Sequence, residues 1–151
     1  MTLKVCQDWG DQYIVGDTLV DSEHKRIIEM ACSFAKLIEA DALSYREALN
    51  TVREVIFHIT THFQHEELLL ELYNADAADI ERHKREHIKL KAILQAAIDD
   101  IRDQKTIPFK DACIALANDL YDLVADHITT VDKETLQPCI SAHDKVHHRA
   151  Y

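Results

Sequence analysis

The sequence contains very little glycine and proline, and this scarcity limits the folds that it can adopt. Its 151 residues include only two glycines and two prolines. No stretch alternates apolar and polar residues in the way that a half-buried strand would. Because 47% of the residues are hydrophobic, a chain of this length can bury a substantial core. We therefore expect one compact all-α domain with short connections.

A positively charged stretch is also absent, and this absence bears on the partners. The formal net charge is -10 at pH 7, and no Lys/Arg-rich stripe offsets it. Such a surface repels nucleic-acid phosphates and anionic lipid, so we expect neither nucleic acid nor a membrane as a partner. The first residues lack a basic segment followed by an apolar one, and no apolar run approaches the length of a membrane span. We expect a cytoplasmic protein.

The four cysteines show no paired spacing. Cys6, Cys32, Cys113 and Cys139 are widely spread, with no C-x-x-C motif and no dense disulfide framework. This usage is typical of a reducing compartment. We predict that all four are free thiols, with Cys32 and Cys113 serving as small residues in or near the core.

Hydrophobic stripes at spacings of three and four residues predict four amphipathic helices. Their start signals are Asp21 as an N-cap, the capping-box pattern Ser44-x-x-Glu47, and Pro108 in the first turn of the last helix. The predicted helices span about residues 21–38, 44–73, 80–101 and 108–127. Short breaks between them favour an antiparallel up-down-up-down four-helix bundle.

This bundle accounts for most of a single domain covering residues 1–151. We place the bundle at about residues 21–132, an N-terminal arm at 1–20 and a short C-terminal tail at 133–151. Trp9 and Tyr13 in the arm are expected to cover one end of the core. The narrow stripes leave the outer helix faces charged, so we expect a monomer.

Polar residues fall within the apolar stripes, and this is the most informative feature of the chain. They are His24, His62, Glu66, His83, His87 and His127. Burying such groups costs several kcal/mol each unless a partner satisfies them. Imidazole and carboxylate are ligands of first-row metals. Together with Asp132, just beyond the last stripe, the set has more ligands than one ion accepts from protein, so we predict two metal ions.

The heights of these residues in the bundle support the prediction independently. Residues equidistant from a turn lie at the same height in an up-down-up-down bundle. Counting outward from each of the three predicted turns leads from one candidate ligand to another or to its neighbour: His24 to His62, Glu66 to His83, and His87 to His127. All four helices therefore present candidate ligands at one end of the bundle.

Asp132 needs a separate explanation. It follows His127 by five residues, which on an ideal α-helix separates two side chains by about 140° around the axis. We therefore predict that Asp132 reaches the site from a loosened final turn or from just beyond the helix.

Other polar residues and motifs do not fit a functional site. His58 and His65 fall off the stripe of their helix, so we expect them to be solvated and not to be ligands. His143, His147 and His148 lie in the expected polar tail. The segment from His65 to Leu69 begins like the H-E-x-x-H motif of zinc proteases but lacks its second histidine, and no phosphate-binding glycine loop or recognisable nucleophile occurs. We expect no organic cofactor and no catalytic residue.

The order and spacing of the candidate ligands resemble those of the bacterial hemerythrins. The resemblance covers roughly residues 9–140, and it includes Trp9, Val15-Gly16 and Pro138-Cys139. The motifs that carry it are His24 within Glu-His-Lys, His62-Phe63-x-x-Glu66-Glu67, His83-x-x-x-His87, and His127-Ile128-x-x-x-Asp132. Any one of these motifs is weak evidence, whereas the ordered set is highly specific.

The resemblance implies a non-haem di-iron centre. In the family, three histidines bind one iron, two bind the other, and two carboxylates and a hydroxide or oxide bridge the pair. Carried over by position, His83, His87 and His127 bind one iron, His24 and His62 bind the other, and Glu66 and Asp132 are the bridges. The two-histidine iron keeps an open position for dioxygen.

The resemblance also implies an apolar oxygen pocket. Its members here are Leu70, Leu123, Val124 and Ile128. This chain departs from the common pattern at three positions: Leu123 replaces a frequent tryptophan, Leu70 a frequent methionine, and Glu23 a frequent glutamine. The pocket stays apolar, which should exclude water, but its shape differs.

We predict reversible dioxygen binding for transport, storage or delivery, without catalysis. Two carboxylate bridges leave the iron pair less anionic than the four-glutamate sites of ferritin-like proteins, and this favours binding over O–O cleavage. Three alternatives stay open: a peroxidase or nitric oxide-handling enzyme, an oxygen or iron sensor acting through a separate partner, and a metal-free helical interaction module. An oxygen-consuming enzyme would be a further partner of the carrier.

Overall fold

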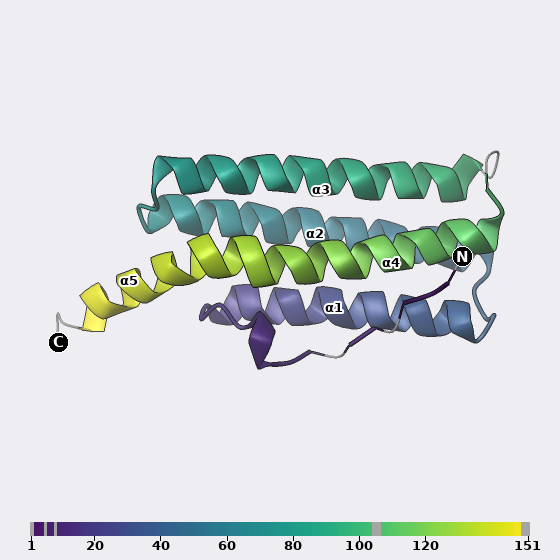
Figure 1. Cartoon of the computed structure of the whole chain (residues 1–151), viewed down its shortest axis with the longest axis horizontal. Coiled ribbons are helices and arrows are strands. Elements are labelled where there is room, and N and C mark those ends of the chain that lie inside the picture. The colour runs from purple at the N-terminus through teal and green to yellow at the C-terminus, as the bar shows by residue number, and fades with distance from the viewer. Residues whose placement is uncertain (1, 5, 8, 104–106, 149–151) are drawn as a thin grey trace.

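Four long helices lie side by side and form the body of the protein (Figure 1). The computed structural model describes all residues except 1, 5, 8, 104–106 and 149–151. The four helices are α1 (Thr18–Glu39), α2 (Tyr45–Leu72), α3 (Ala77–Asp103) and α4 (Phe109–His127). Helices α1 and α3 each pack against α2 and α4, which confirms the all-α antiparallel four-helix bundle.

Local side-chain caps explain where the first two long helices begin. Asp17 is the N-cap of α1 and accepts a hydrogen bond from the backbone N–H of Val20. Our prediction of Asp21 as this cap was wrong, because its carboxylate instead accepts hydrogen bonds from the backbone N–H groups of Val15 and Gly16, at 2.8 Å and 3.2 Å. The predicted capping box at the start of α2 is confirmed, with both of its hydrogen bonds present.

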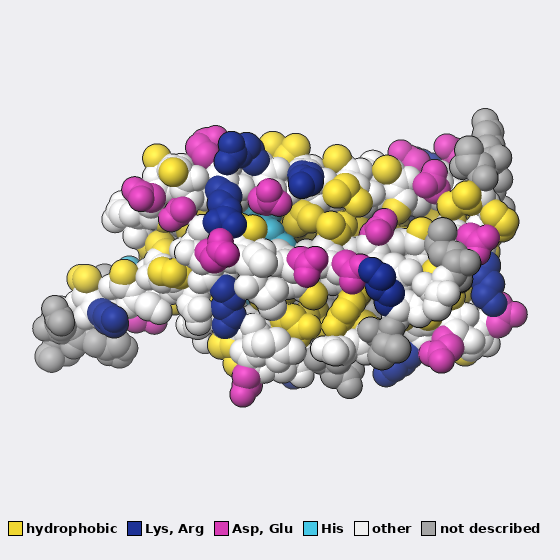
Figure 2. Space-filling view, in the orientation of Figure 1, with side chains coloured by type: hydrophobic (Ala, Val, Ile, Leu, Met, Phe, Trp, Pro, Cys, Tyr) yellow, Lys and Arg dark blue, Asp and Glu magenta, His cyan; other side chains and the backbone are white. Residues whose placement is uncertain are grey.

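The buried apolar side chains form two clusters of unequal size. The larger cluster fills most of the bundle from Ile27 to Ile128, and the smaller one contains Val15, Val20, Leu70, Leu136 and Ile140. His24 on α1 and Glu66 on α2 lie in sequence between residues of the two clusters. On the face shown in Figure 2, charged side chains follow the outer ridges of the helices while apolar side chains fill the seams between them.

The chain continues as helix beyond α4. A π-helix, η2 (Ile128–Leu136), follows α4 directly and leads into α5 (Gln137–His148), which projects past the end of the bundle (Figure 1). The expected polar tail is therefore helical over most of its length. His143 stacks on Tyr73 with ring centroids 3.7 Å apart, so part of α5 packs against the end of α2.

The N-terminal arm runs back along the bundle (Figure 1). It contains a short 3-10 helix, η1 (Asp11–Tyr13), and Tyr13 is buried while Trp9 packs on the larger core cluster. The backbone N–H of Lys4 donates to Asn118 on α4 at 2.8 Å, and the Lys4 ammonium pairs with Asp122. The arm therefore covers the seam between α1 and α4.

A disulfide bond joins this arm to α1, and it corrects our prediction for two of the four cysteines. Cys6 is bonded to Cys32, with Cα atoms 5.4 Å apart, whereas Cys113 and Cys139 are free. The pairing depends on how the arm folds back over α1, which the spacing of the cysteines along the chain does not reveal. It also removes one basis for the expected cytoplasmic location, because that expectation rests partly on free thiols.

Among the helices that the structure describes, none combines the length and the apolar character that crossing a membrane requires.

Candidate metal centre

The structure brings all seven predicted ligands to one place inside the bundle. They are His24 on α1, His62 and Glu66 on α2, His83 and His87 on α3, His127 at the end of α4, and Asp132 in η2. None of the seven is more than 5% exposed. On the face shown in Figure 2, almost no histidine surface reaches solvent. The periodicity and the turn-counting arguments therefore located the residues correctly.

The seven side chains form two groups that could each hold a metal ion. One group is Glu66, His83, His87 and His127, and the other is His24, His62, Glu66 and Asp132. Within each group, one potential ligand atom from every residue lies within 4.8 Å of the others. Glu66 belongs to both groups, so the two candidate sites are adjacent.

The carboxylate of Glu66 faces both groups at once. Its Oε1 atom lies 2.9 Å from His24 Nε2 and 2.7 Å from His62 Nε2. Its Oε2 atom lies 3.0 Å from His87 Nε2 and 3.6 Å from His127 Nε2. One oxygen therefore serves each group, and this is the geometry of a bridging ligand.

Asp132 also spans the two groups, and the π-helix makes this possible. Its Oδ2 atom lies 3.2 Å from His24 Nε2, and its Oδ1 atom lies 3.1 Å from His127 Nε2. In a π-helix the hydrogen bonds join residues five apart, so a side chain five residues after His127 returns to the same face. The predicted loosening of the final turn is confirmed, and it takes the form of this π-helical segment.

The buried polar atoms test whether a cation fits here. Both oxygens of Asp132 and the Nδ1 atoms of His24, His83 and His127 are buried without a hydrogen-bond partner. A buried carboxylate without a regular hydrogen bond is costly. The imidazoles of His24 and His127 approach the Asp132 oxygens at 3.2 Å and 3.1 Å, and a cation between these groups would satisfy all of them. The donor set consists of imidazole nitrogens and carboxylate oxygens, which suits first-row transition metals. The residues present therefore fit a pair of such ions.

Strong electrostatic coupling links the histidines to the two acids. Burial alone would lower the pKa of His62, but the charge of Glu66 and the hydrogen bonds to Glu23 and Glu66 raise it to about 10. The pKa of His127 likewise rises to about 10 against the effect of burial, because of the charge of Asp132 and the close contacts of its Nε2 atom with both acids. Burial would raise the pKa of Glu66, yet its charge interaction with His62 and hydrogen bonds to neighbouring histidines hold it well below the ordinary value. Protons and metal ions therefore compete for the same nitrogen atoms.

Two further glutamates orient ligand histidines. His87 Nδ1 donates to Glu67 Oε1 at 2.8 Å. His62 Nδ1 lies 3.4 Å from Glu23 Oε1, and the other oxygen of Glu23 accepts from His65 Nδ1 at 2.7 Å. Such a carboxylate fixes the tautomer of a histidine and directs its Nε2 lone pair toward a metal.

Sequence reasoning missed the orienting role of these glutamates. Glu23 stood out only as a departure from the family pattern, and Glu67 only as part of a motif. The available signal was their position, because each is directly next to a candidate ligand in the sequence. His65 belongs to neither ligand group, but it is only partly solvated, because its side chain is 36% exposed and its Nδ1 atom donates to Glu23.

Thr135 is a buried polar contact that the sequence did not single out. Its hydroxyl donates to the backbone carbonyl of Val131 at 2.6 Å and accepts from His83 Nε2. The expected helix ended before this residue, so periodicity gave no reason to place it in the site. Like Asp132, whose Oδ1 atom lies 3.7 Å from His83 Nε2, Thr135 approaches His83 from the π-helix.

Apolar side chains enclose the polar centre. Phe63 stacks flat on His87, with ring centroids 3.9 Å apart and an angle of 6° between the rings. Of the residues expected to line an oxygen pocket, Val124 and Ile128 belong to the larger core cluster and Leu123 packs against it, whereas Leu70 belongs to the smaller one. The role of these four residues in oxygen binding stays a prediction.

Comparison with known proteins agrees with the ligand geometry. The family model described as the hemerythrin HHE cation-binding domain matches residues 15–138, which include all seven candidate ligands. A search of curated proteins and a search of solved structures returned no significant match. The match to the family model spans most of the chain, and the chain therefore belongs to the hemerythrin HHE cation-binding family.

Proposed function

We propose that the protein holds two iron ions and uses them to bind dioxygen reversibly. His83, His87 and His127 would hold one ion, His24 and His62 the other, and Glu66 and Asp132 would bridge them. The observation that carries this proposal is the carboxylate of Glu66, which turns one oxygen toward each histidine group. A single metal ion would not require this arrangement.

The unequal division of histidines supports oxygen binding. Three histidines surround one candidate site and two surround the other, so the second ion has one protein ligand fewer and keeps a position for a small molecule. Two ferrous ions, when bound, would supply the electrons for binding dioxygen, a chemistry that imidazole and carboxylate groups lack. The protein's own contribution is to fix the five imidazoles and to exclude water from them, since every ligand is buried.

The small number of acids favours reversible binding over oxidation. Only two carboxylates, Glu66 and Asp132, lie within the two candidate ligand groups. Di-iron sites of the ferritin-like class use four glutamates, and the greater negative charge of those sites stabilises more highly oxidised iron. The less anionic centre in this chain suits the release of unchanged dioxygen.

Iron stoichiometry and oxygen cycling test the proposal. The purified protein should hold two irons per chain, and the diferrous form should develop a visible absorption band on mixing with oxygen and lose it on deoxygenation. Immediate and irreversible oxidation would contradict reversible binding, and a colourless zinc protein would contradict the choice of metal.

Two histidines of α2 offer a matched pair of variants for the same test. His62→Ala removes a candidate ligand, whereas His65→Ala removes a half-exposed histidine from the next turn of the same helix. We expect the first variant to lose iron and the oxygen-dependent band, and the second to retain both. Equal loss in the two variants would contradict the ligand assignment.

A further inference from the structure

The disulfide bond between Cys6 and Cys32 lies in the wall of a surface groove. The groove has a volume of about 460 Å³, and it is formed by the N-terminal arm, α1 and α4, with both cysteines in its lining. Cys6 is partly exposed, whereas Cys32 is only 5% exposed. Access is one of the factors that set the rate of thiol–disulfide exchange. A small thiol that enters the groove therefore meets the sulfur of Cys6 first.

Apart from this bond, exposed contacts hold the beginning of the arm on the bundle. The side-chain amide of Asn118 on α4 donates to the carbonyl of Thr2 at 3.0 Å and accepts from the backbone N–H of Lys4 at 2.8 Å, and both hydrogen bonds are exposed. The ion pair of Lys4 with Asp122 is exposed as well, and Trp9 is only partly buried. Exposed polar contacts contribute little to stability, because water competes for them. The covalent bond is therefore the strongest attachment of this part of the arm.

The next part of the arm reaches the segment that carries Asp132. Tyr13 is buried, and its hydroxyl lies 3.5 Å from the hydroxyl of Tyr121 on α4. The ammonium group of Lys133 donates to the backbone carbonyl of Ile14, and Lys133 directly follows Asp132 in η2. The short helix η1 also contacts η2. The arm therefore connects the disulfide on α1 to the π-helix that positions a candidate ligand.

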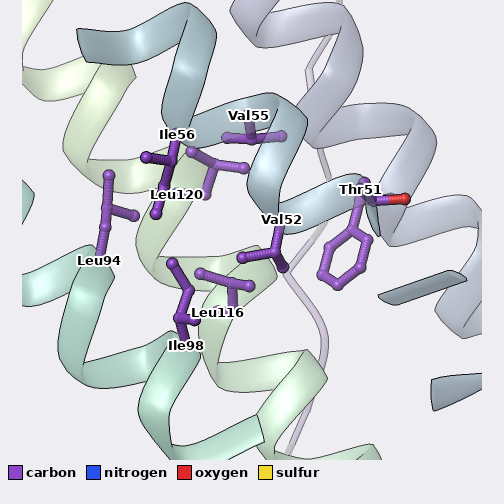
Figure 3. A pocket seen from close by; sticks show the side chains of 9 residues that line it. Thr51, Val52, Val55, Ile56, Leu94, Ile98, Leu116 and Leu120 are labelled. Atoms are coloured by element: carbon purple, nitrogen blue, oxygen red, sulfur yellow. The ribbon is translucent and has the colours of Figure 1, made fainter. Parts of the chain in front are cut away.

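The core beneath the arm is closed by the four long helices themselves. A small internal space of about 10 Å³ remains between them, and all of its lining residues belong to α1, α2, α3 and α4. Figure 3 shows Val52, Leu94 and Leu116, from three of these helices, gathered around it. A close-packed apolar core of this kind does not need the arm to fill it. We therefore expect release of the arm to be a local event that leaves the helices folded.

We propose that the Cys6–Cys32 disulfide is a redox-sensitive latch that holds the arm on α1 and is opened by a dithiol entering the groove. One thiolate of the dithiol attacks the sulfur of Cys6, the bond to Cys32 breaks, and Cys32 takes up a proton. The second thiol of the dithiol then displaces Cys6 from the mixed disulfide. The dithiol leaves oxidised, as a disulfide, and both cysteines are left as thiols. The reverse reaction with an oxidised dithiol closes the latch.

Opening the latch loosens the hold of the arm on η2. Once the bond is broken, the arm separates from the bundle more often, and the contact between Ile14 and Lys133 is lost for part of the time. Asp132 is then held less firmly, and water reaches the candidate ligands along the seam between α1 and α4. Iron bound at these ligands should therefore leave the reduced protein faster. This effect on iron rests on the proposed function, whereas the release of the arm does not.

Limited proteolysis measures the release of the arm, in metal-free and in iron-loaded protein. Chymotrypsin should cut after Trp9 or Tyr13 severalfold faster once a dithiol has reduced the bond, while circular dichroism shows that the helices persist. The Cys6→Ser/Cys32→Ser protein should be cut at the fast rate without any reductant. Cys139→Ser, which removes a free and half-buried thiol, is the matched control and should behave as the wild type. Equal cleavage of the oxidised and reduced wild type, or cleavage spread over the bundle, would overturn the proposal.

Iron release to a chelator measures the coupling to the metal centre, after the dithiol has been removed under argon. Release should be severalfold faster from the reduced wild type than from the oxidised wild type. Lys133→Ala breaks the contact with Ile14 directly, so it should release iron faster in the oxidised state and gain little more on reduction. Lys89→Ala, at an exposed lysine of α3, is its control and should behave as the wild type.

Two results would overturn the coupling: equal iron release from the oxidised and reduced wild type, or a full additional effect of reduction in the Lys133→Ala protein. A protein that bound no iron would contradict the proposed function. Proteolysis of the metal-free protein would still decide whether the disulfide is a latch, so the two failures are distinguishable.

Discussion

The same four helices build two halves of the bundle that differ in how they are stabilised. In the half that contains the candidate ligands lie all eight buried polar side chains that the structure describes: the seven candidate ligands and Thr135. The opposite half is closed by apolar residues such as Ile38, Ala48, Ile101 and Ala112, each at most 4% exposed. The ligand half contains hydrogen bonds and ion pairs and would be stabilised further by bound cations, whereas the apolar half depends on packing.

This difference shows that one fold can combine a destabilising cluster of buried polar groups with an apolar core that stabilises it. Buried imidazoles and carboxylates oppose folding unless they are paired, and metal-binding free energy becomes folding free energy when the site does not exist in the unfolded chain. Close-packed apolar side chains need no such partner. Substitutions in the two halves should therefore give different phenotypes.

The largest effect is expected from removing the shared carboxylate. Glu66→Ala deletes the group that faces both histidine sets, so both irons should be lost. Atomic spectrometry of the purified protein measures this directly. Glu71→Ala is the control, because Glu71 is an exposed glutamate of the same helix that pairs with Lys84 at 3.2 Å. Retention of two irons by the Glu66→Ala protein would contradict the claim that iron binding in the ligand half depends on this carboxylate.

The stability of the metal-free protein should depend strongly on pH. The pKa values of His62 and His127 are raised from the ordinary 6.5 to about 10. Their contribution to the free energy of unfolding is complete below pH 6.5 and is lost as the pH rises toward 10. The lowered pKa of Glu66 has the opposite effect on stability. The ionised Glu66 carboxylate stabilises the folded protein above pH 4.5, its ordinary pKa, and this contribution is lost as the pH falls below that value.

Denaturant unfolding at several pH values checks this dependence. Chelator-treated protein should be less stable at pH 9 than at pH 6. Iron-loaded protein should instead lose iron as the pH falls, because protons compete with the metal for imidazole. Parallel pH profiles for the two forms would contradict the account.

A cavity in the apolar half should reduce stability and leave iron binding intact. Ile101 is completely buried, and replacing a buried isoleucine by alanine costs about 2–5 kcal/mol. Ile101→Ala should therefore lower the free energy of unfolding by this amount while keeping two irons per chain. Loss of iron from the folded variant would show that the halves are not independent.

Breaking the disulfide should have a somewhat smaller effect. Cys6 and Cys32 are 26 residues apart, and losing a bond that closes a loop of this size costs about 2–4 kcal/mol. The double variant Cys6→Ser/Cys32→Ser should show this loss in thermal or denaturant unfolding. A dithiol reductant should destabilise the wild type similarly and leave the double variant unaffected. Equal sensitivity of both proteins to the reductant would contradict the pairing.

The smallest effect is expected from the orienting glutamates. Removing such a hydrogen-bond partner of a metal ligand lowers metal affinity by about 10- to 100-fold. Glu67→Ala should weaken iron binding within this range, and Glu23→Ala should weaken it less, because the contact of Glu23 with His62 is longer, 3.4 Å against 2.8 Å. Competition with a chelator measures both, with Glu71→Ala as the reference.

The sequence predicted correctly which polar side chains meet inside the bundle, because one strong physical pattern governs their positions, while their binding of metal stays a prediction. Each histidine on an apolar stripe must point inward, and helical rise converts turn positions into heights. This argument needs no knowledge of loops or termini. It placed His24 opposite His62 and His87 opposite His127, and the structure confirms that these residues lie together.

Other features could not be predicted because they depend on contacts between distant segments. Cys6 meets Cys32 only after the arm folds along α1, and the spacing of the cysteines in the sequence does not predict this contact. Thr135 reaches His83 from the π-helix that continues the chain after His127, beyond the point where the last predicted helix ended. Asp21 resembles an N-cap in the sequence, but the preceding turn at Gly16, with φ of +106°, shifts the helix start to Thr18.

Anomalous diffraction at the iron absorption edge tests the central claim most directly. Crystals of the iron-loaded protein should show two peaks of similar height, one on each side of the Glu66 carboxylate. The first peak should lie among His83, His87 and His127, and the second between His24 and His62. A single peak, or iron bound anywhere other than these two positions, would contradict the account.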